Sequence, residues 1–292
     1  EEIAAWVASV QDSPDAPRAS RMSLRLFGGA HGITAEGVSA VPDSVNQQMM
    51  LNFRQGGAAI NSLCRSNGID FQSYDAGIDH PTRNFLHEPA MSESETVEAF
   101  ALGWGSVPQF TDVFAVGEMG IGNTTPSVAI LSAITGVPSD SIIGRGTGLT
   151  DDALARKSLT IRQALANRSS EFTSPLSILA SIGGREIAAM TGAILRATSM
   201  RIPVVLDGLI AGAAAAIAFG IQPASRSCCL AGHRSAEPAH DSFLSHFGLD
   251  PLLDLRMRLG EGSGAAVAMG IVRNAVDTFH QMATFEQAGV VI

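Results

Sequence analysis

Six segments of the chain have patterns of apolar residues that predict buried parallel strands. These segments are Met22–Gly29, Ile69–Ile78, Asp112–Gly120, Arg201–Leu209, Ser225–His233 and Pro251–Gly260. Helical patterns lie between most of them, at Ser44–Ser66, Pro126–Thr135, Arg185–Ser199 and Ile210–Phe219. Because strands alternate with helices, we expect an α/β fold in which helices cover both faces of a parallel sheet.

Polar and glycine-rich residues stand at the carboxyl end of each expected strand. The stretches are GGAHG, DAGID, GEMGIGNT, LDG, AGHRSAEP and RLGEGSG. In open parallel sheets, ligands bind beyond the carboxyl ends of the strands. Six polar strand ends therefore predict one large composite site along a single edge of the sheet.

The two ends of the chain lie outside this alternation. Residues 1–20 hold a short helical pattern and a proline-containing linker, and Gly264–Phe285 has the pattern of a long helix of small and apolar residues. We therefore expect a large α/β catalytic domain at residues 21–262 and a small helical domain built from residues 1–20 and 263–292. The apolar run 208–221 is too short to span a bilayer and indicates a helix buried all round.

Composition narrows the class of protein. The 292 residues are 46% hydrophobic and 16% charged, which is typical of a well-buried globular protein. The net charge of −9 argues against a nucleic-acid partner, whose phosphates require clustered Lys and Arg. Three cysteines without a spacing pattern fit a reduced, cytoplasmic protein. The chain begins at Glu1 without a methionine, so we expect the native N-terminus to lie upstream.

Residues 117–124, GEMGIGNT, nearly match the P-loop pattern G-x-x-x-x-G-K-[ST], but Asn123 stands where the lysine is required. The stretch follows an expected strand and opens a helix, whose free N–H groups favour anions. Without the lysine, the loop suits a phosphomonoester better than a triphosphate with Mg²⁺. The alternative is a tight turn that binds no ligand. The dinucleotide pattern G-x-G-x-x-G does not fit, because the order here is G-x-x-G-x-G.

Two further glycine-rich segments carry charged candidates. GRGTGL, residues 144–149, precedes a helical pattern with Thr150 as its N-cap. Lys157 on that helix is either an ordinary surface lysine or the cation missing at Asn123. RLGEGSGAA, residues 258–266, places Glu261 between two glycines. That carboxylate can serve as a general base, particularly if burial raises its pKa, or it can cap the following helix.

The histidines give weaker signals. His233 and His240 in GHRSAEPAH are separated by a proline and lack further ligands of defined geometry, so we expect no metal there. Contact of Arg234 and Ser235 with a phosphate or ribose is the better interpretation. His31 in GGAHG is either catalytic or a strand-end histidine that satisfies loop carbonyls.

Together these motifs resemble those of one family, the nicotinate-nucleotide–dimethylbenzimidazole phosphoribosyltransferases of the lower-ligand branch of cobalamin synthesis. The similarity runs from about residue 22 to the end of the chain. Its segments are HGITAEGVSA, GGAAIN, GEMGIGNTT, GRGTGL with LARK, IPVVLDG, AGHRSAEP, LDLRMRLGEGSGAA and MATFEQAGV. AGHRSAEP and GEMGIGNTT are together very specific.

The resemblance implies transfer of phosphoribose from nicotinate mononucleotide to a nitrogen of 5,6-dimethylbenzimidazole, which gives α-ribazole 5′-phosphate and nicotinate. Glu261 matches the family's general base, and Glu118 and Lys157 match residues that assist it. Nicotinate leaves neutral at its ring nitrogen and no diphosphate departs, so neither a metal nor another cofactor is expected.

The resemblance also implies the binding contacts. The aromatic acceptor is expected against Ser39, Gln47 and Leu259. The phosphate and ribose are expected against the glycine loops and two polar side chains, at Gly120, Gly122, Asn123, Thr124, Gly146, Ser235 and Arg258.

Three features depart from the family pattern. Ala30 stands where the family often has an aspartate, the connection from Asp79 to Thr82 is shorter than usual, and the expected N-terminal helices are mostly absent. The first and third leave the proposed base and phosphate groups intact, whereas the short connection could affect closure over the substrate.

The family's fold is a Rossmann-like domain with a parallel six-stranded sheet, plus a small helical domain from both chain ends, and it forms a homodimer. The resemblance therefore implies a homodimer here. Two alternatives stay open. A catalytically silent or altered-acceptor homologue would bind a nucleotide, and a nucleotide-binding oxidoreductase would require the G-x-G-x-x-G motif that is missing.

Overall fold

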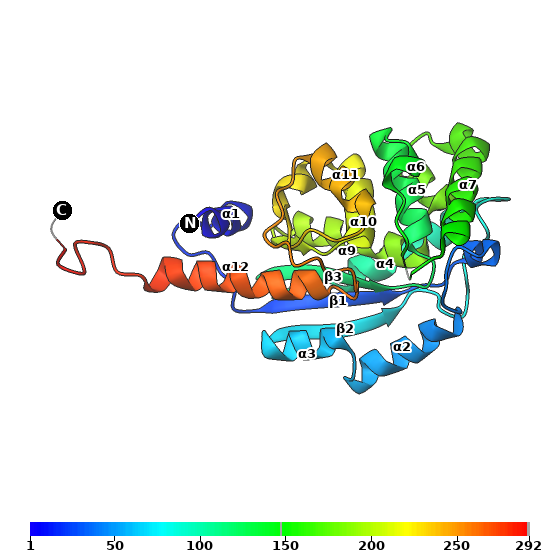
Figure 1. The fold of residues 1–292 in the computed structure, drawn as a ribbon. Coiled ribbons are helices and arrows are strands. Elements are labelled where there is room, and N and C mark those ends of the chain that lie inside the picture. Colours follow the sequence, from blue (N-terminus) through cyan, green and yellow to red (C-terminus); the bar gives the residue numbers. More distant parts are fainter. Residues whose placement is uncertain (147, 291–292) are drawn as a thin grey trace.

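A parallel sheet of five strands forms the centre of the computed structural model, which describes residues 1–146 and 148–290 (Figure 1). The strands are β1 (Met22–Gly28), β2 (Ile69–Asp75), β3 (Val113–Met119), β4 (Val204–Leu206) and β5 (Cys229–Ala231). Their order is β2-β1-β3-β4-β5, which is one of the two common orders of doubly wound sheets. The order reverses between β1 and β3, and the carboxyl ends beside such a reversal are where these sheets bind ligands.

The prediction of a sixth strand at Pro251–Gly260 is wrong. The segment is irregular apart from one isolated parallel bridge at Leu253. Arg256 has a φ of 56°, in the left-handed region, and an extended strand cannot continue through that conformation. The predicted strand Ser225–His233 is also too long, because a 3₁₀ helix, η3 (Pro223–Cys228), takes up its first residues.

One face of the sheet is covered by α2 (Ser44–Gln55), α3 (Ala59–Ser66) and α12 (Ser263–Gln281) (Figure 1). The single helical pattern predicted at Ser44–Ser66 is two helices, because Gly56 ends α2 with a φ of 78°. A glycine adopts that backbone conformation without the cost that a Cβ atom would add.

The other face is covered by a thicker layer of helices (Figure 1). Its members are α4 (Glu93–Ser106), α5 (Thr124–Thr135), α7 (Asp151–Arg168), α8 (Pro175–Ile182), α9 (Arg185–Ser199), α10 (Leu209–Ile221) and α11 (Pro238–Phe247). Shorter elements connect them or flank the site, at η1 (Gly32–Glu36), α6 (Ser139–Ile142) and η2 (Ser169–Glu171). The residues of α10 are buried from Leu209 to Phe219, as the sequence predicts.

Strand β3 shows how the two layers are built. Val113 and Ala115 belong to the core on the side of α3 and α12, whereas Phe114 and Val116 belong to the core on the side of α9 and α10. This alternation is the period of two that a strand imposes on its side chains. Because both faces are buried, the polar ends of the strands are the part of the sheet left for chemistry.

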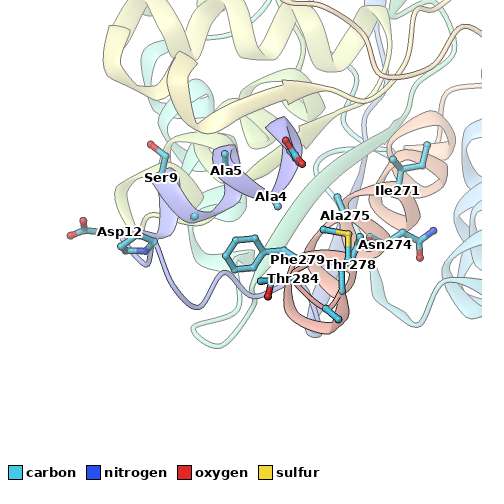
Figure 2. A pocket seen from close by; sticks show the side chains of 15 residues that line it. Ala4, Ala5, Ser9, Asp12, Ile271, Asn274, Ala275, Thr278, Phe279 and Thr284 are labelled. Atoms are coloured by element: carbon cyan, nitrogen blue, oxygen red, sulfur yellow. The ribbon is translucent and has the colours of Figure 1, made fainter. Parts of the chain in front are cut away.

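The helices of the two chain ends lie beside each other. The first half of α12 packs on the sheet, and its second half lies near α1 (Glu2–Gln11) (Figure 1). A largely apolar groove of about 1030 Å³ separates α1 from this second half, and Ala4, Ala275 and Phe279 line it (Figure 2). The groove lies toward the amino ends of the strands, away from the predicted site.

The division into a large and a small domain stays a prediction. None of the described helices has the length and apolar character needed to cross a membrane.

Candidate functional site

A cavity of about 400 Å³ opens at the carboxyl ends of β3, β4 and β5. It therefore lies on the edge of the sheet that the polar strand ends predict. Most of the predicted site residues line it, namely Glu118, Gly120, Asn123, Thr124, Gly146, Ser235, Arg258, Leu259 and Glu261. Segments far apart in the sequence thus meet in one place, because Glu118 and Ser235 follow strands with adjacent carboxyl ends and the loops that carry Gly146 and Glu261 reach the same edge.

Glu118 is the carboxylate at the end of β3, and it is buried. Burial raises its pKa to about 8, and the nearby carboxylates of Asp207 and Glu186 contribute to the increase, whereas a hydrogen bond from Asn123 opposes it. Glu118 is therefore mainly protonated at neutral pH.

Asn123 does not cap α5 with its side chain, although it occupies the N-cap position. Its Nδ2 instead donates a hydrogen bond to Glu118 Oε2 at 2.5 Å. Asn123, which stands in the position of the P-loop lysine, thus forms a hydrogen bond with a carboxylate. Gly122, which has a φ of 88°, forms the turn before α5 and lies outside the cavity lining that the described residues define.

Glu261 stands in a turn of three successive left-handed residues. The φ angles of Gly260, Glu261 and Gly262 are 81°, 64° and 81°. Glutamate rarely adopts this conformation, and such strain concentrates at functional sites. A Cβ atom added at Gly117 would come within 2.4 Å of the Glu261 carbonyl oxygen, so β3 and this turn touch through backbone.

The Glu261 carboxylate is fixed by α3, which covers the same face of the sheet as α12. Its Oε2 accepts a hydrogen bond from the Ile60 N–H at 3.2 Å, at the first turn of α3. Burial raises the pKa of Glu261, the Ile60 bond lowers it, and Asp207 raises it. The prediction of Glu261 as a helix cap gains no support, since the N-cap of α12 is Gly262 and the Glu261 carboxylate is bonded to α3.

Lys157 is fully buried, so its interpretation as a surface lysine is wrong. Its Nζ donates to Thr124 Oγ1 at 2.8 Å and to the Gly144 carbonyl at 3.3 Å. Burial lowers the pKa of Lys157 to about 8, and the charge of Glu237 opposes that decrease. The ammonium therefore stands directly behind Thr124 and supplies positive charge at the cavity wall. Within the neighbouring GRGTGL loop, residue 147 lies outside the described residues.

Ser235 follows β5, and hydrogen bonds to its backbone N–H and to its hydroxyl hold it in place. Its N–H donates to His240 Nδ1 at 2.9 Å, and its Oγ accepts from the Glu237 N–H at 3.3 Å. Burial lowers the pKa of His240 to about 4, so this ring is neutral and can accept the bond. Arg234, the other polar candidate of this segment, instead pairs with Asp241 at the surface. The structure therefore favours Ser235 over Arg234 as a substrate contact.

Three acidic or basic residues at the cavity were not among the predicted site residues. They are Asp207, His233 and Glu237. Asp207 Oδ1 accepts from the Ala265 N–H at 3.0 Å and lies 3.4 Å from His233 Nε2. All three stand just after a strand, in the quoted segments LDG and AGHRSAEP, so the same rule that selected Glu118 could have selected them.

The expected acceptor contacts are only partly at the cavity. Leu259 lines it and is 57% exposed, and Met49 of α2 lines it as well. Ser39 bonds to Val41 in the loop after η1, and Gln47 Nε2 donates to Asp79 Oδ1 at 2.5 Å. Neither lies in the cavity lining as the described residues define it, so their contact with an acceptor stays a prediction.

His31 is buried and does not line the cavity within the described part of the chain. Its Nε2 lies 2.7 Å from Glu186 Oε1, and the Glu186 carboxylate is likewise fully buried. The His31 ring therefore pairs with a carboxylate and not with the loop carbonyls that the sequence analysis considered. Among the described residues, no cluster of three or more His, Cys, Asp or Glu is arranged to hold a metal ion.

Comparison with known proteins gives consistent matches. A family model described as phosphoribosyltransferase (DBI_PRT) matches residues 1–290. The nicotinate-nucleotide–dimethylbenzimidazole phosphoribosyltransferase of Methylocella silvestris is 47% identical, and that of Brucella anthropi is 44% identical. Each alignment spans 290 residues, 99% of this chain and 85% of the relative.

A solved structure agrees with these matches. CobT from Thermus thermophilus is 36% identical and superposes with a TM-score of 0.94. The match covers 99% of this chain and 92% of that one. The parallel α/β architecture described above is therefore shared with that protein along nearly the whole chain.

Proposed function

This chain belongs to the phosphoribosyltransferase family, and we propose that it transfers phosphoribose from nicotinate mononucleotide to 5,6-dimethylbenzimidazole. The products are α-ribazole 5′-phosphate and nicotinate. The observation that carries the proposal is the pair of buried carboxylates, Glu118 and Glu261, which line one cavity beside a glycine loop with a lysine behind it. The names of the relatives supply the substrates.

The reaction balances without a metal. The bond between C1′ of the ribose and the pyridinium nitrogen breaks, and its electron pair stays on nicotinate, which becomes neutral at that nitrogen. One nitrogen of dimethylbenzimidazole forms the new bond to C1′, and the proton on the other nitrogen must leave. We assign that proton to the Glu261 carboxylate as general base, which ordinarily contributes about 10²–10⁴ in rate.

Glu118 has a role that changes on binding. Its pKa of about 8 keeps it mainly protonated before substrate binds. A pyridinium cation, and then the positive charge that develops at C1′, favours the ionised carboxylate. Glu118 thus becomes negatively charged when the cationic substrate binds. Asn123 holds the Glu118 carboxylate in position through the 2.5 Å hydrogen bond.

Several groups at one end of the cavity are suited to the phosphate. The N-terminus of α5 carries partial positive charge, Thr124 offers a hydroxyl, and Lys157 lies behind that hydroxyl. Ser235 and the exposed Arg258 border the same cavity. We assign the phosphate to this end, which leaves the end near Met49 and Leu259 for the apolar acceptor.

The catalytically silent alternative is not favoured, because Glu118, Lys157 and Glu261 are all present at or directly behind the cavity. Ala30 is buried, and its carbonyl accepts a hydrogen bond from the Thr82 N–H, so this position contributes a backbone contact to the short connection.

We also propose a homodimer, which the resemblance supports. Sedimentation should then give about twice the chain mass of 30.4 kDa, and a single chain mass would overturn it.

The direct test is incubation of the protein with nicotinate mononucleotide, with and without dimethylbenzimidazole. We expect nicotinate release that requires the acceptor, in equal amount to α-ribazole 5′-phosphate. A chelator such as EDTA should leave the rate unchanged. No acceptor-dependent release would overturn the activity, and loss of the rate in EDTA, restored by a divalent ion, would overturn the metal-free mechanism.

A further inference from the structure

The segment GGAAIN, residues 56–61, runs from the C-cap of α2 into the first turn of α3. Its Ile60 N–H donates to Glu261 Oε2 at 3.2 Å across 201 residues of sequence. The bond is buried, and Ile60 itself is fully buried in the core beneath α12. The proposed base is thus held by a helix that contributes no side chain to the cavity lining among the described residues.

Asn61 fixes the position of that N–H group. Its Oδ1 accepts from the Ala58 N–H at 3.0 Å, and its Nδ2 donates to the Phe53 carbonyl at 3.0 Å. The side chain therefore ties the N-cap of α3 to the last turn of α2. Asn61 is only 7% exposed, so both bonds are shielded from water. Breaking them would free the turn on which Ile60 sits.

The turn itself is closely packed, which leaves little freedom for compensation. A Cβ atom at Gly57 would come within 2.4 Å of Asn52 Oδ1, and Gly56 has a left-handed φ of 78°. The connection between α2 and α3 therefore has one compact arrangement.

We propose that Asn61 is a positioning residue for the transfer reaction, because it fixes the α3 N-terminus whose Ile60 N–H orients the Glu261 carboxylate. The inference rests on the proposed function. The bond uses Oε2, and a carboxylate has a second oxygen with which to take the acceptor proton. An N–H donor at a helix N-terminus also favours the ionised carboxylate.

Other titratable and charged groups lie around Glu261. Glu118 of β3 lies next to Gly260, and Asp207 follows β4 with His233 beside it. Arg258 lies on the loop that carries Glu261. Asp207 raises the pKa of Glu261, as burial does, and the Ile60 bond lowers it. Loss of the Ile60 bond should therefore raise the pKa of the base and leave the other contributions in place.

The test is the pH profile of kcat for nicotinate release in Asn61→Ala at saturating substrate, because the bound pyridinium favours ionised Glu118 and the acid limb then reports Glu261. We expect its acid limb to move upward by about one pH unit. The variant should then be about tenfold slower than the wild type below that limb and should approach it above. A reduction by one factor at every pH, with the limb unmoved, would overturn the proposal.

A second variant guards against a folding defect in Asn61→Ala. Replacement of the Ile60 amide N–H by an ester oxygen, through incorporation of the α-hydroxy acid, removes the donor and keeps the side chain. It should shift the acid limb in the same direction, and an unmoved limb would overturn the proposal. Ala59→Pro is the matched control, because Ala59 is exposed at the first helical position and its change leaves the Ile60 N–H in place.

The outcomes separate this inference from the proposed function. If the wild type shows no acceptor-dependent nicotinate release, the proposed function fails. If the wild type is active and both variants keep its acid limb, the activity stands and the positioning role of Asn61 fails.

Discussion

Asn123 Nδ2 donates to Glu118 Oε2 at 2.5 Å, so the residue in the P-loop lysine position supports a carboxylate. We propose that the charge for the phosphate comes instead from Lys157, whose Nζ lies behind Thr124. A loop with the spacing of a triphosphate site is thereby suited to a substrate that combines a phosphate with a cationic ring. The raised pKa of Glu118 has consequences both for substrate binding and for stability.

Binding of nicotinate mononucleotide near pH 7 should release protons from Glu118. Its pKa of about 8 leaves it mainly protonated beforehand, and the pyridinium charge favours the carboxylate. Calorimetric titration in buffers of different ionisation enthalpy measures this release. Glu118→Gln should bind with up to about one proton fewer released. Equal release by both proteins would contradict the assignment.

The same pKa predicts how stability depends on pH. Folding raises the pKa of Glu118 from 4.5 to about 8, so the folded state binds this proton more tightly than the unfolded state. The stabilisation is fully present below pH 4.5 and is lost as the pH rises toward 8. Glu118→Gln and the wild type should have about the same melting temperature at acid pH. Between about pH 5 and pH 8, the melting temperature of the variant should rise relative to that of the wild type. A constant difference across this range would contradict the raised pKa.

Lys157→Met should weaken binding of nicotinate mononucleotide. The variant removes a buried ammonium next to Thr124, and loss of a charge-assisted contact ordinarily costs about tenfold to hundredfold in affinity. We expect KM for nicotinate mononucleotide to rise by that factor in steady-state assays. Arg156→Met removes the same charge from an exposed neighbour and should leave KM unchanged. Equal KM values for the two variants would count against Lys157 as the phosphate cation.

Gly117→Ala should displace the turn that carries Glu261. The added Cβ would come within 2.4 Å of the Glu261 carbonyl oxygen, and overpacking of this kind costs about 1–3 kcal/mol. Urea unfolding should show the loss of stability, and nicotinate release should slow as the base moves. Gly105→Ala on α4 is the control, since nothing lies within 4 Å of its added Cβ. Full activity in Gly117→Ala would show that the turn adjusts without consequence.

Sequence patterns could predict which residues meet, because the carboxyl ends of parallel strands share an edge. This rule selects Glu118, and Asp207 and Glu237 could have been found in the same way. Glu261 is selected through a sixth strand that does not form, and it reaches the same edge on an irregular loop. The patterns could not predict the left-handed conformation of Arg256, which prevents a sixth strand. A run of alternating apolar residues looks the same whether or not its backbone stays extended.

The remaining properties depend on packing across long distances in the chain. Lys157 belongs to a helix with many charged residues, and only the position of α7 against the α5 N-terminus buries it. Asn61 and Glu261 are connected through a backbone N–H, which no residue type can signal. Composition and periodicity describe local preference, whereas these contacts are set by tertiary structure.

Glu261→Gln tests the central claim most directly, because it removes the base and keeps the shape of the side chain. Single-turnover release of nicotinate in the presence of dimethylbenzimidazole should slow by at least about a hundredfold, while acceptor binding is retained. Glu93→Gln, an exposed change on α4, is the matched control and should release nicotinate at the wild-type rate. A Glu261→Gln rate within a few-fold of the wild type would contradict the general-base mechanism.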